Sequence, residues 1–166
     1  MNELLEQIRS NPLSIEFIAN PSEDLQIEAI KLDYRAIQFI KNPSYKVQLE
    51  AIKVNHLAIK YIEEPLQKVQ EKLVKENPNA IYYINNPSEK TQVLALLNNP
   101  GVLEYIKNPS DEVLNKLFSL YPSAIRHMDN PSERIQLLAI SKYKDAIKYI
   151  QNPSEKILKL IEKLEN

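Results

Sequence analysis

Seven prolines recur along this chain at a constant spacing of 22 residues, without an insertion or deletion between them. They are Pro21, Pro43, Pro65, Pro87, Pro109, Pro131 and Pro153. Each of the other four prolines lies nine residues before a member of this series: Pro12, Pro78, Pro100 and Pro122. Because all 11 prolines fall into two columns of one period, we predict a tandem array of 22-residue units.

Two groups of apolar residues recur in each unit when the unit is numbered from its first proline. Positions 5, 9 and 10 form the first group, as in Val47, Ala51 and Ile52. Positions 16, 17 and 20 form the second group, as in Ala58 and Ile62. Residues with these spacings share one face of a helix. Each unit is therefore predicted to be a pair of amphipathic helices, helix A of about three turns and helix B of about two turns.

A stack of such helix pairs predicts an all-α, right-handed solenoid in which neighbouring units cover each other's apolar faces. We expect one domain over residues 1–166. It consists of an N-terminal cap unit at 1–20, six full repeats over 21–152 and a C-terminal half-repeat cap at 153–166. In the first unit, Glu3 and Gln7 replace apolar residues, as expected of a terminal unit with a polar outer face.

The motif Asn-Pro-Ser-Glu, or a close variant, surrounds most of the seven prolines. Proline is well tolerated at the first position of a helix, and asparagine before it is a common N-cap. We therefore expect Asn20 to cap helix A, with an extended backbone, and Pro21, Ser22 and Glu23 to take positions N1, N2 and N3. The acid at N3 would complete a capping box. Four residues are expected to cap helix B: Asp33, Asn55, Asn77 and Asn99.

Counts of particular residue types exclude several kinds of chemistry. The absence of cysteine excludes disulfides, thiolate metal sites and a cysteine nucleophile. A single glycine, Gly101, excludes a glycine-rich phosphate loop. The two histidines, His56 and His127, occupy scaffold positions in different units. We therefore expect no catalytic residue, no cofactor and no metal site, in a protein that is not an enzyme.

Charge and hydropathy limit which partners the protein can bind and where in the cell it is expected. A net charge of −1 indicates no overall attraction to nucleic acid or to an anionic membrane. The sequence has no long apolar run and no N-terminal segment with the features of a signal peptide. We expect a cytoplasmic protein that does not bind membranes.

Positions 4, 8 and 11 of each unit are expected to form the exposed ridge of helix A. In the middle of the chain this ridge carries four lysines: Lys68, Lys72, Lys75 and Lys90. Such a patch could bind nucleic-acid phosphates or an acidic protein. The alternative is an ordinary solubilising face, which acids nearby would dilute.

Later in the chain the same ridge becomes apolar, at Leu94, Leu97 and Leu138. Exposed apolar surface often marks a partner-binding site. The alternative is that these side chains pack against the neighbouring unit. We predict that the four lysines and these three leucines contact a partner.

Two further rows of residues follow the period. Position 6 is Gln in most units, and we expect its amide to hydrogen-bond between units or to the turns, not to bind a ligand. Position 19 is Phe or Tyr in most units. We expect these rings to lie at the edge of the core with their polar tips in water, the alternative being a platform for stacking bases.

The repeat N-P-S-E-x-V-Q-x-x-A-I-x-x-N-P-x-A-I-x-Y-I-x resembles short α-solenoid repeats of the HEAT-like and leucine-rich-repeat-variant class. It also resembles 22-residue tandem repeats of phage and giant-virus proteins of unknown function. The resemblance covers the whole chain and implies a scaffold that binds other macromolecules. The iron–sulfur cluster of some leucine-rich-repeat-variant proteins is not implied, because this chain has no cysteine.

We expect a non-catalytic scaffold that binds a protein partner along an extended helical face. One alternative is a phage or mobile-element inhibitor of a host defence complex, similar to an anti-CRISPR protein, which would act in the host cytoplasm. A second alternative is a nucleic-acid-binding, HEAT-like protein that uses the basic patch. The motif fails most clearly at Glu64-Pro65-Leu66-Gln67, so functional residues are expected around Glu64–Lys90.

Overall fold

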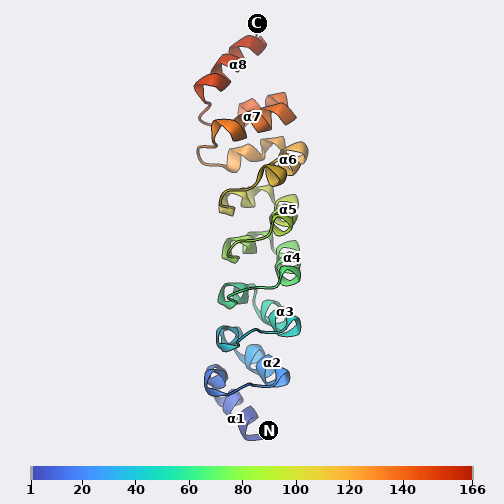
Figure 1. Cartoon of the computed structure of the whole chain (residues 1–166), viewed down its shortest axis with the longest axis vertical. Coiled ribbons are helices and arrows are strands. Elements are labelled where there is room, and N and C mark those ends of the chain that lie inside the picture. Colours follow the sequence, from blue (N-terminus) through green and yellow to red (C-terminus); the bar gives the residue numbers. More distant parts are fainter. Residues whose placement is uncertain (1, 166) are drawn as a thin grey trace. The chain divides into compact units, whose positions relative to one another are not determined.

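The computed structural model describes residues 2–165, and within this range all regular structure is helical (Figure 1). Long α-helices alternate with short 3-10 helices, and from α2 onward each α-helix begins 22 residues after the previous one. This confirms the predicted all-α solenoid of helix pairs. Of the predicted domain boundaries, Met1 and Asn166 lie outside the described residues.

The α-helices, which correspond to helix A, are α1 (Asn2–Ser10), α2 (Glu23–Leu32), α3 (Tyr45–Val54), α4 (Gln67–Glu76), α5 (Glu89–Asn98), α6 (Asp111–Leu120), α7 (Glu133–Lys142) and α8 (Glu155–Glu165). The 3-10 helices, which correspond to helix B, are η1 (Pro12–Phe17), η2 (Tyr34–Phe39), η3 (His56–Tyr61), η4 (Pro78–Tyr83), η5 (Pro100–Tyr105), η6 (Pro122–His127) and η7 (Lys144–Tyr149). No helix within residues 2–165 has both the length and the apolar character needed to cross a membrane.

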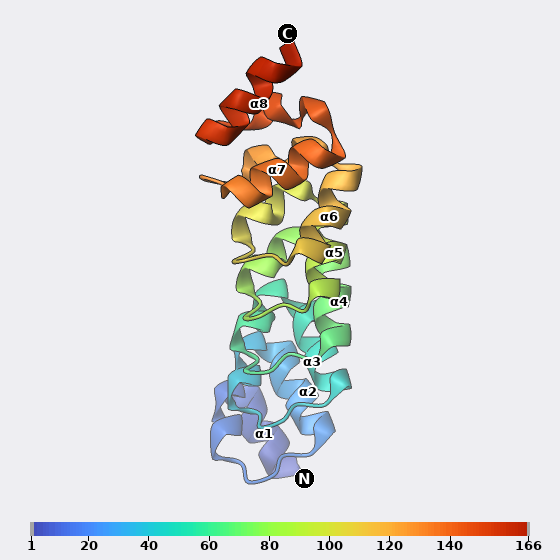
Figure 2. The same cartoon turned by 45° about the horizontal axis from the view of Figure 1, so that its top comes forward.

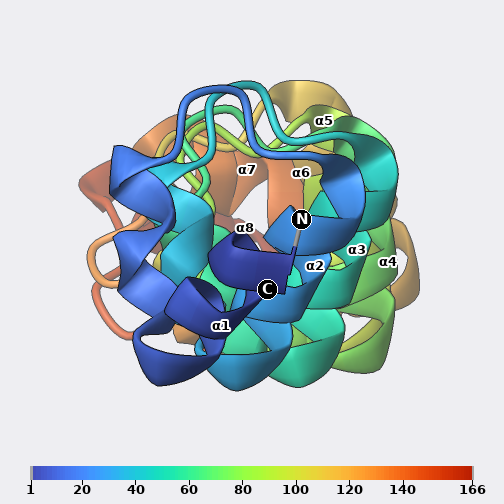
Figure 3. The same ribbon diagram turned by 90° about the horizontal axis from the view of Figure 1, so that it is seen from below.

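The chain forms two compact units, Met1–Pro87 and Ser88–Asn166. In the first unit, α1 to α4 pack successively against one another and η1 to η4 do the same as a second layer. Figure 3 looks along this unit, where α2, α3 and α4 lie behind one another. In the second unit, α5 to α8 and η5 to η7 repeat this two-layer arrangement. The predicted single domain over residues 1–166 stays a prediction.

The core of each repeat lies between its α-helix and its 3-10 helix, as the apolar spacing predicts. In the repeat of α3 and η3, the residues Val47, Ala51, Ile52, Ala58 and Ile59 are all buried. Full burial of a Val or Ile side chain stabilises the fold by about 1.5–3 kcal/mol. Helices of ten residues are marginal alone, so this packing is what maintains them.

From α2 onward, the long helices begin at the position of the motif's acid, two residues later than the sequence analysis predicts. Ser22 is the N-cap of α2, and its hydroxyl accepts a hydrogen bond from the Leu25 N–H at 3.4 Å. The prediction that Asn20 is the N-cap, with Pro21 at N1 and Glu23 at N3, is therefore wrong. Ser and Asn are both good N-caps, but the proline between them has no N–H to donate, and the hydroxyl two residues on reaches the helix amide.

The asparagine of the motif has a different role, because it makes a turn. Asn20 has a φ of 49°, in the left-handed region and not in the predicted extended region. The equivalent residues Asn42, Asn86, Asn108 and Asn130 share this conformation. Asparagine tolerates left-handed backbone better than most residues other than glycine. In these repeats it therefore turns the chain out of the 3-10 helix and into the linker, the segment that leads to the next α-helix (Figure 2).

The short helices begin largely as predicted. Side-chain oxygens of Asp33, Asn55 and Asn99 accept hydrogen bonds from backbone N–H groups two residues further along. Asn77 occupies the predicted N-cap position of η4, but among the described residues its side chain makes no capping bond. Its Nδ2 instead lies 3.3 Å from Nδ1 of His56. The short helices are of the 3-10 type, with six residues each, which the spacing alone did not distinguish from α-helix.

Candidate partner-binding surfaces

The acid of the motif joins successive repeats and does not fold back onto its own helix start. One carboxylate oxygen of Glu23 accepts a hydrogen bond from the Ser44 hydroxyl at 2.6 Å, and the other accepts one from Lys46 Nζ at 3.0 Å. Both partners belong to the next repeat. The predicted capping box is therefore wrong, and we call Glu23, Ser44 and Lys46 the motif cluster.

Electrostatics favour this motif cluster. The hydrogen bonds from Ser44 and Lys46 lower the pKa of Glu23 below its ordinary value of 4.5. The same contact with Glu23 raises the pKa of Lys46. In the second unit, Asp111 pairs with Arg134 and Glu133 pairs with Lys156 in the same relation. In these three cases a base at position 4 pairs with an acid of the preceding repeat.

One repeat later, two of the three equivalent residues change together. Tyr45 takes the place of Glu23, Leu66 takes the place of Ser44, and Lys68 stays as the equivalent of Lys46. We call these three residues the substituted cluster. Within the described part of the chain, α4 has no side-chain cap and Lys68 makes no ion pair. The lysine is retained while its acid is lost.

A shallow hollow of about 400 Å³ lies beside the substituted cluster on α3 and α4. We call it the α4 hollow, and its lining residues are Tyr45, Lys68, Glu71, Lys72, Lys75 and Glu76. Three of the predicted partner-binding lysines therefore surround one surface feature, as their helical spacing predicts. Lys72 pairs with Glu76 at 3.2 Å, and Glu71 accepts a hydrogen bond from Gln67 at 2.8 Å.

The other predicted partner-binding residues belong to the second unit. Lys90, Leu94 and Leu97 lie on α5, and Leu138 lies on α7. Lys90 is exposed, whereas the three leucines are half-buried. Their role in binding a partner stays a prediction.

A second kind of surface feature, which the sequence analysis did not predict, lies between successive linkers of the first unit. Linker groove 1 has a volume of about 550 Å³ and is lined by Glu16, Phe17, Ile18, Ala19, Asn20, Pro21, Gln26, Phe39, Ile40 and Lys41. Linker groove 2 has a volume of about 700 Å³ and is lined by Ile37, Gln38, Ile40, Lys41, Asn42, Pro43, Gln48, Tyr61, Ile62, Glu63, Glu64 and Leu66. Most of these residues are equivalent after a shift of 22 positions, so the grooves are the same feature in successive repeats. The feature of the sequence that pointed to these grooves was the exposed, polar character of the linker residues.

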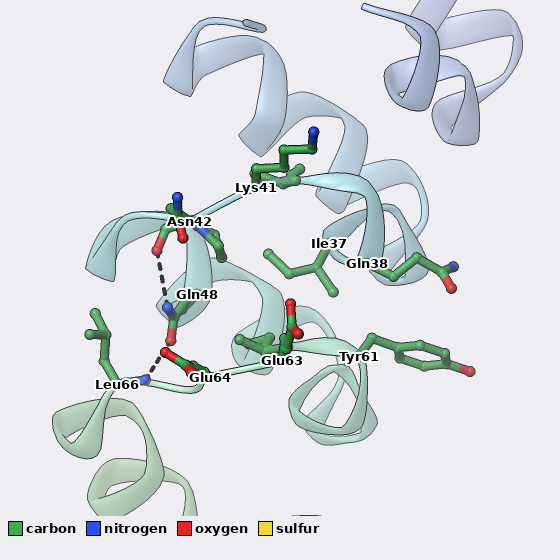
Figure 4. A pocket seen from close by; sticks show the side chains of 12 residues that line it. Ile37, Gln38, Lys41, Asn42, Gln48, Tyr61, Glu63, Glu64 and Leu66 are labelled. Carbon is green, nitrogen blue, oxygen red and sulfur yellow. Dashed lines mark hydrogen bonds between the residues drawn. The ribbon is translucent and has the colours of Figure 1, made fainter.

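Gln48 connects the two linkers that border linker groove 2 (Figure 4). Its Nε2 donates to the Pro43 carbonyl at 3.0 Å, and its Oε1 accepts from the Leu66 N–H at 2.9 Å. Gln136 in the second unit repeats the pattern with Pro131 and Ser154. These contacts confirm the prediction that the glutamine row hydrogen-bonds to the turns and between repeats.

Aromatic side chains of position 19 border the linker grooves. Phe17 is 80% exposed, while Phe39 and Tyr61 are half-buried. In Figure 4 the Tyr61 ring extends outward from its 3-10 helix at the edge of linker groove 2. The ring also lies 4.8 Å from Lys60 Nζ and 6.0 Å from the ring of Tyr34. The half-burial of Phe39 and Tyr61 agrees with the predicted place at the core edge, whereas Phe17 is more exposed than predicted.

A histidine of η3 and a glutamate of α4 lie close together. His56 lies beside Glu76, with Nε2 3.9 Å from the carboxylate, and beside Asn77. Across residues 2–165 no group of three or more metal-ligating side chains is close enough to hold an ion.

No protein-family model, curated protein or solved structure matches this chain. The helical repeat architecture therefore stands on the structure itself, and the resemblance to phage and giant-virus repeats stays a prediction.

Proposed function

We propose that this chain is a non-catalytic scaffold that binds an extended segment of a protein partner across the linker grooves of its first unit. The observation that carries the proposal is the recurrence of one groove in successive repeats, with an accessible aromatic ring at each edge. A feature that repeats at the pitch of the scaffold suits a partner that is itself periodic.

The spacing of the repeats fits an extended polypeptide. Packed helices lie about 8–10 Å apart. A polyproline II segment rises about 3.1 Å per residue, so three of its residues span about one repeat. Because this extended conformation has three residues per turn, every third side chain of such a partner would face an equivalent groove.

The groove walls supply the contacts that such a partner needs. Linker residues Lys41 and Asn42 are exposed, and within the described chain their peptide groups make no backbone–backbone hydrogen bond. They are free to bond to the peptide groups of a partner. Phe17, Phe39 and Tyr61 add apolar surface, and aromatic residues are enriched where proteins bind one another.

Site-specific photo-crosslinking tests this proposal. A benzophenone amino acid placed at Tyr61 or at Phe17 is expected to form a covalent adduct with a protein in extracts of the native host. The control position is Lys31, which is exposed on α2 outside both grooves. Equal adducts from Lys31 and Tyr61, or no adduct from either groove position, would contradict the proposal.

A second candidate function is nucleic-acid binding, and the uncompensated charge of Lys68 favours it. It predicts retention of nucleic acid that weakens steeply as salt is raised, because bound phosphates release counterions. Inhibition of a host defence complex is one form of protein binding and stays a prediction.

A further inference from the structure

We infer that the α4 hollow is a binding site for an acidic segment of a protein, with Lys68 and Lys75 as its cationic contacts. The residues that line this hollow differ from those that line the linker grooves. The inference therefore concerns a separate surface and does not depend on the proposed function of the grooves.

The first observation is an uncompensated charge at a position where Lys46, Arg134 and Lys156 are each paired with an acid of the preceding repeat. Lys46 is bound by Glu23 at 3.0 Å. Lys68 stands at the same position one repeat later and makes no ion pair among the described residues. Tyr45 occupies the position where an acid would bind it. Lys75 likewise makes no ion pair in residues 2–165. Both ammonium groups are exposed and available to an external anion.

The second observation is that the carboxylate and the hydroxyl of the motif cluster are lost together, although they belong to two successive repeats. Tyr45 removes the carboxylate, and Leu66 removes the hydroxyl that would have donated to it. Leu66 also leaves α4 without a side-chain cap among the described residues, so the change lowers helix stability. Local rules of folding are most often broken where a site is needed.

The third observation is the distribution of charge, which favours a polypeptide over a nucleic acid. Lys68 and Lys75 are separated by seven residues of helix, or about 10 Å along its axis. Glu71 lies between them, and Lys72 is already paired with Glu76. A strand with a phosphate at every nucleotide would place negative charge against these acids. Two carboxylates three residues apart in a polyproline II segment lie on the same side of it, about 9 Å apart, so they match the two lysines and avoid the acids.

Tyr45 completes the chemistry of the site. Its side chain is 44% exposed beside Lys68 in the hollow. The phenol hydroxyl can donate a hydrogen bond to a carboxylate, which the glutamate of the motif cluster cannot do. The substitution therefore converts an acid that competes for the lysine into a donor that assists it.

The test uses the whole chain and a fluorescein-labelled peptide that carries glutamate at every third position with serine between, and binding is followed by anisotropy at low salt. The double variant Lys68→Ala/Lys75→Ala is expected to lower the affinity at least about tenfold, because two charge pairs are lost. The matched control is Lys46→Ala, whose lysine is already paired, and its affinity should change by less than about twofold. Absence of peptide binding to the unchanged chain, or equal effects of the two variants, would overturn the inference.

A second variant rebuilds the motif cluster. It separates loss of peptide binding from loss of stability. Tyr45→Glu with Leu66→Ser restores the acid and the cap, so the fold should become more stable while peptide binding is lost. Retained peptide binding in this variant would contradict the inference. Labelled oligo(dT) is measured in parallel: if it binds and the glutamate peptide does not, the site is one for nucleic acid and the inference is wrong.

Discussion

The starts of α3 and α4 lie one repeat apart and use different residues for the same task. At α3, Ser44 caps the helix, and Glu23 binds both Ser44 and Lys46. At α4, Leu66 occupies the cap position. Both helices nevertheless have ten residues and begin at equivalent positions.

The difference shows that the motif is not needed at every helix start. The Leu66 N–H, one of the donors at the entrance to α4, is bound by Oε1 of Gln48 from the preceding repeat. Gln48 thus joins the Pro43 carbonyl to the Leu66 N–H, and we call this connection the glutamine bridge. Because the bridge holds the backbone in place, the residues of the motif are free to change. A repeat with this second support can lose its acid and expose a lysine without losing its helix.

The largest expected effect follows removal of the bridge. Gln48→Leu leaves the Pro43 carbonyl and the Leu66 N–H without their partner, and we expect a loss of about 2–4 kcal/mol in unfolding free energy. Leucine is compatible with this position, since Leu114 occupies it in the second unit. Urea denaturation followed by circular dichroism measures the change.

The matched control for the bridge is Gln26→Leu. Gln26 is half-buried and donates to the Pro21 carbonyl at 2.8 Å, so a loss of only about 1 kcal/mol is expected. Equal losses in the two variants would show that the bridge to Leu66 does not support α4.

A smaller effect is expected at the turn before each helix. Asn42 has a φ of 50°, and alanine there is strained, so Asn42→Ala should cost about 1–2 kcal/mol. Glu64 is the equivalent residue before α4 and is not among the described residues with positive φ. Glu64→Ala should therefore leave the denaturation midpoint unchanged, and a similar loss in both variants would contradict this comparison.

Adding the missing cap should have an effect of opposite sign. Leu66→Ser supplies a hydroxyl to the start of α4, and we expect a gain of about 0.5–1 kcal/mol. Leu66 is 44% exposed, so little apolar burial is lost. The readout is the thermal unfolding midpoint. A decrease would show that Leu66 stabilises α4 by packing.

The smallest effect concerns pH and distinguishes the motif cluster from the substituted cluster. The folded-state pKa of Glu23 is lowered by Ser44 and then by Lys46, so the unfolded chain binds the proton more readily. The stabilisation is complete above about pH 4.5 and is lost as the pH falls through the lower folded-state pKa. Glu23→Gln should therefore reduce stability at neutral pH but not in strong acid.

Tyr45→Phe is the control for this pH dependence, because Tyr45 carries no carboxylate. Its stability difference from the unchanged chain should be the same in weak and in strong acid. A stability difference for Glu23→Gln that persists in strong acid would show that the charge of Glu23 is not the cause.

The period, the helix pairs and the buried faces were all predictable from the sequence. They depend on residues close together in the chain, such as Val47, Ala51 and Ile52, whose spacing places them on one face of a helix. The caps at Asp33, Asn55 and Asn99 were predictable for the same reason. The helical spacing of Lys68, Lys72 and Lys75 likewise predicted that they share one surface.

The roles within the motif were decided by the tertiary structure. Asn20 and Ser22 are both suitable caps, and only the direction in which the chain leaves the preceding 3-10 helix determines which residue turns and which caps. The reach of Glu23 to Ser44 and Lys46 depends on how one repeat packs against the next. The linker grooves and the exposure of Lys68 arise in the same way. Short-range spacing is therefore written in the sequence, whereas contacts between residues about one repeat apart exist only after the helices have stacked.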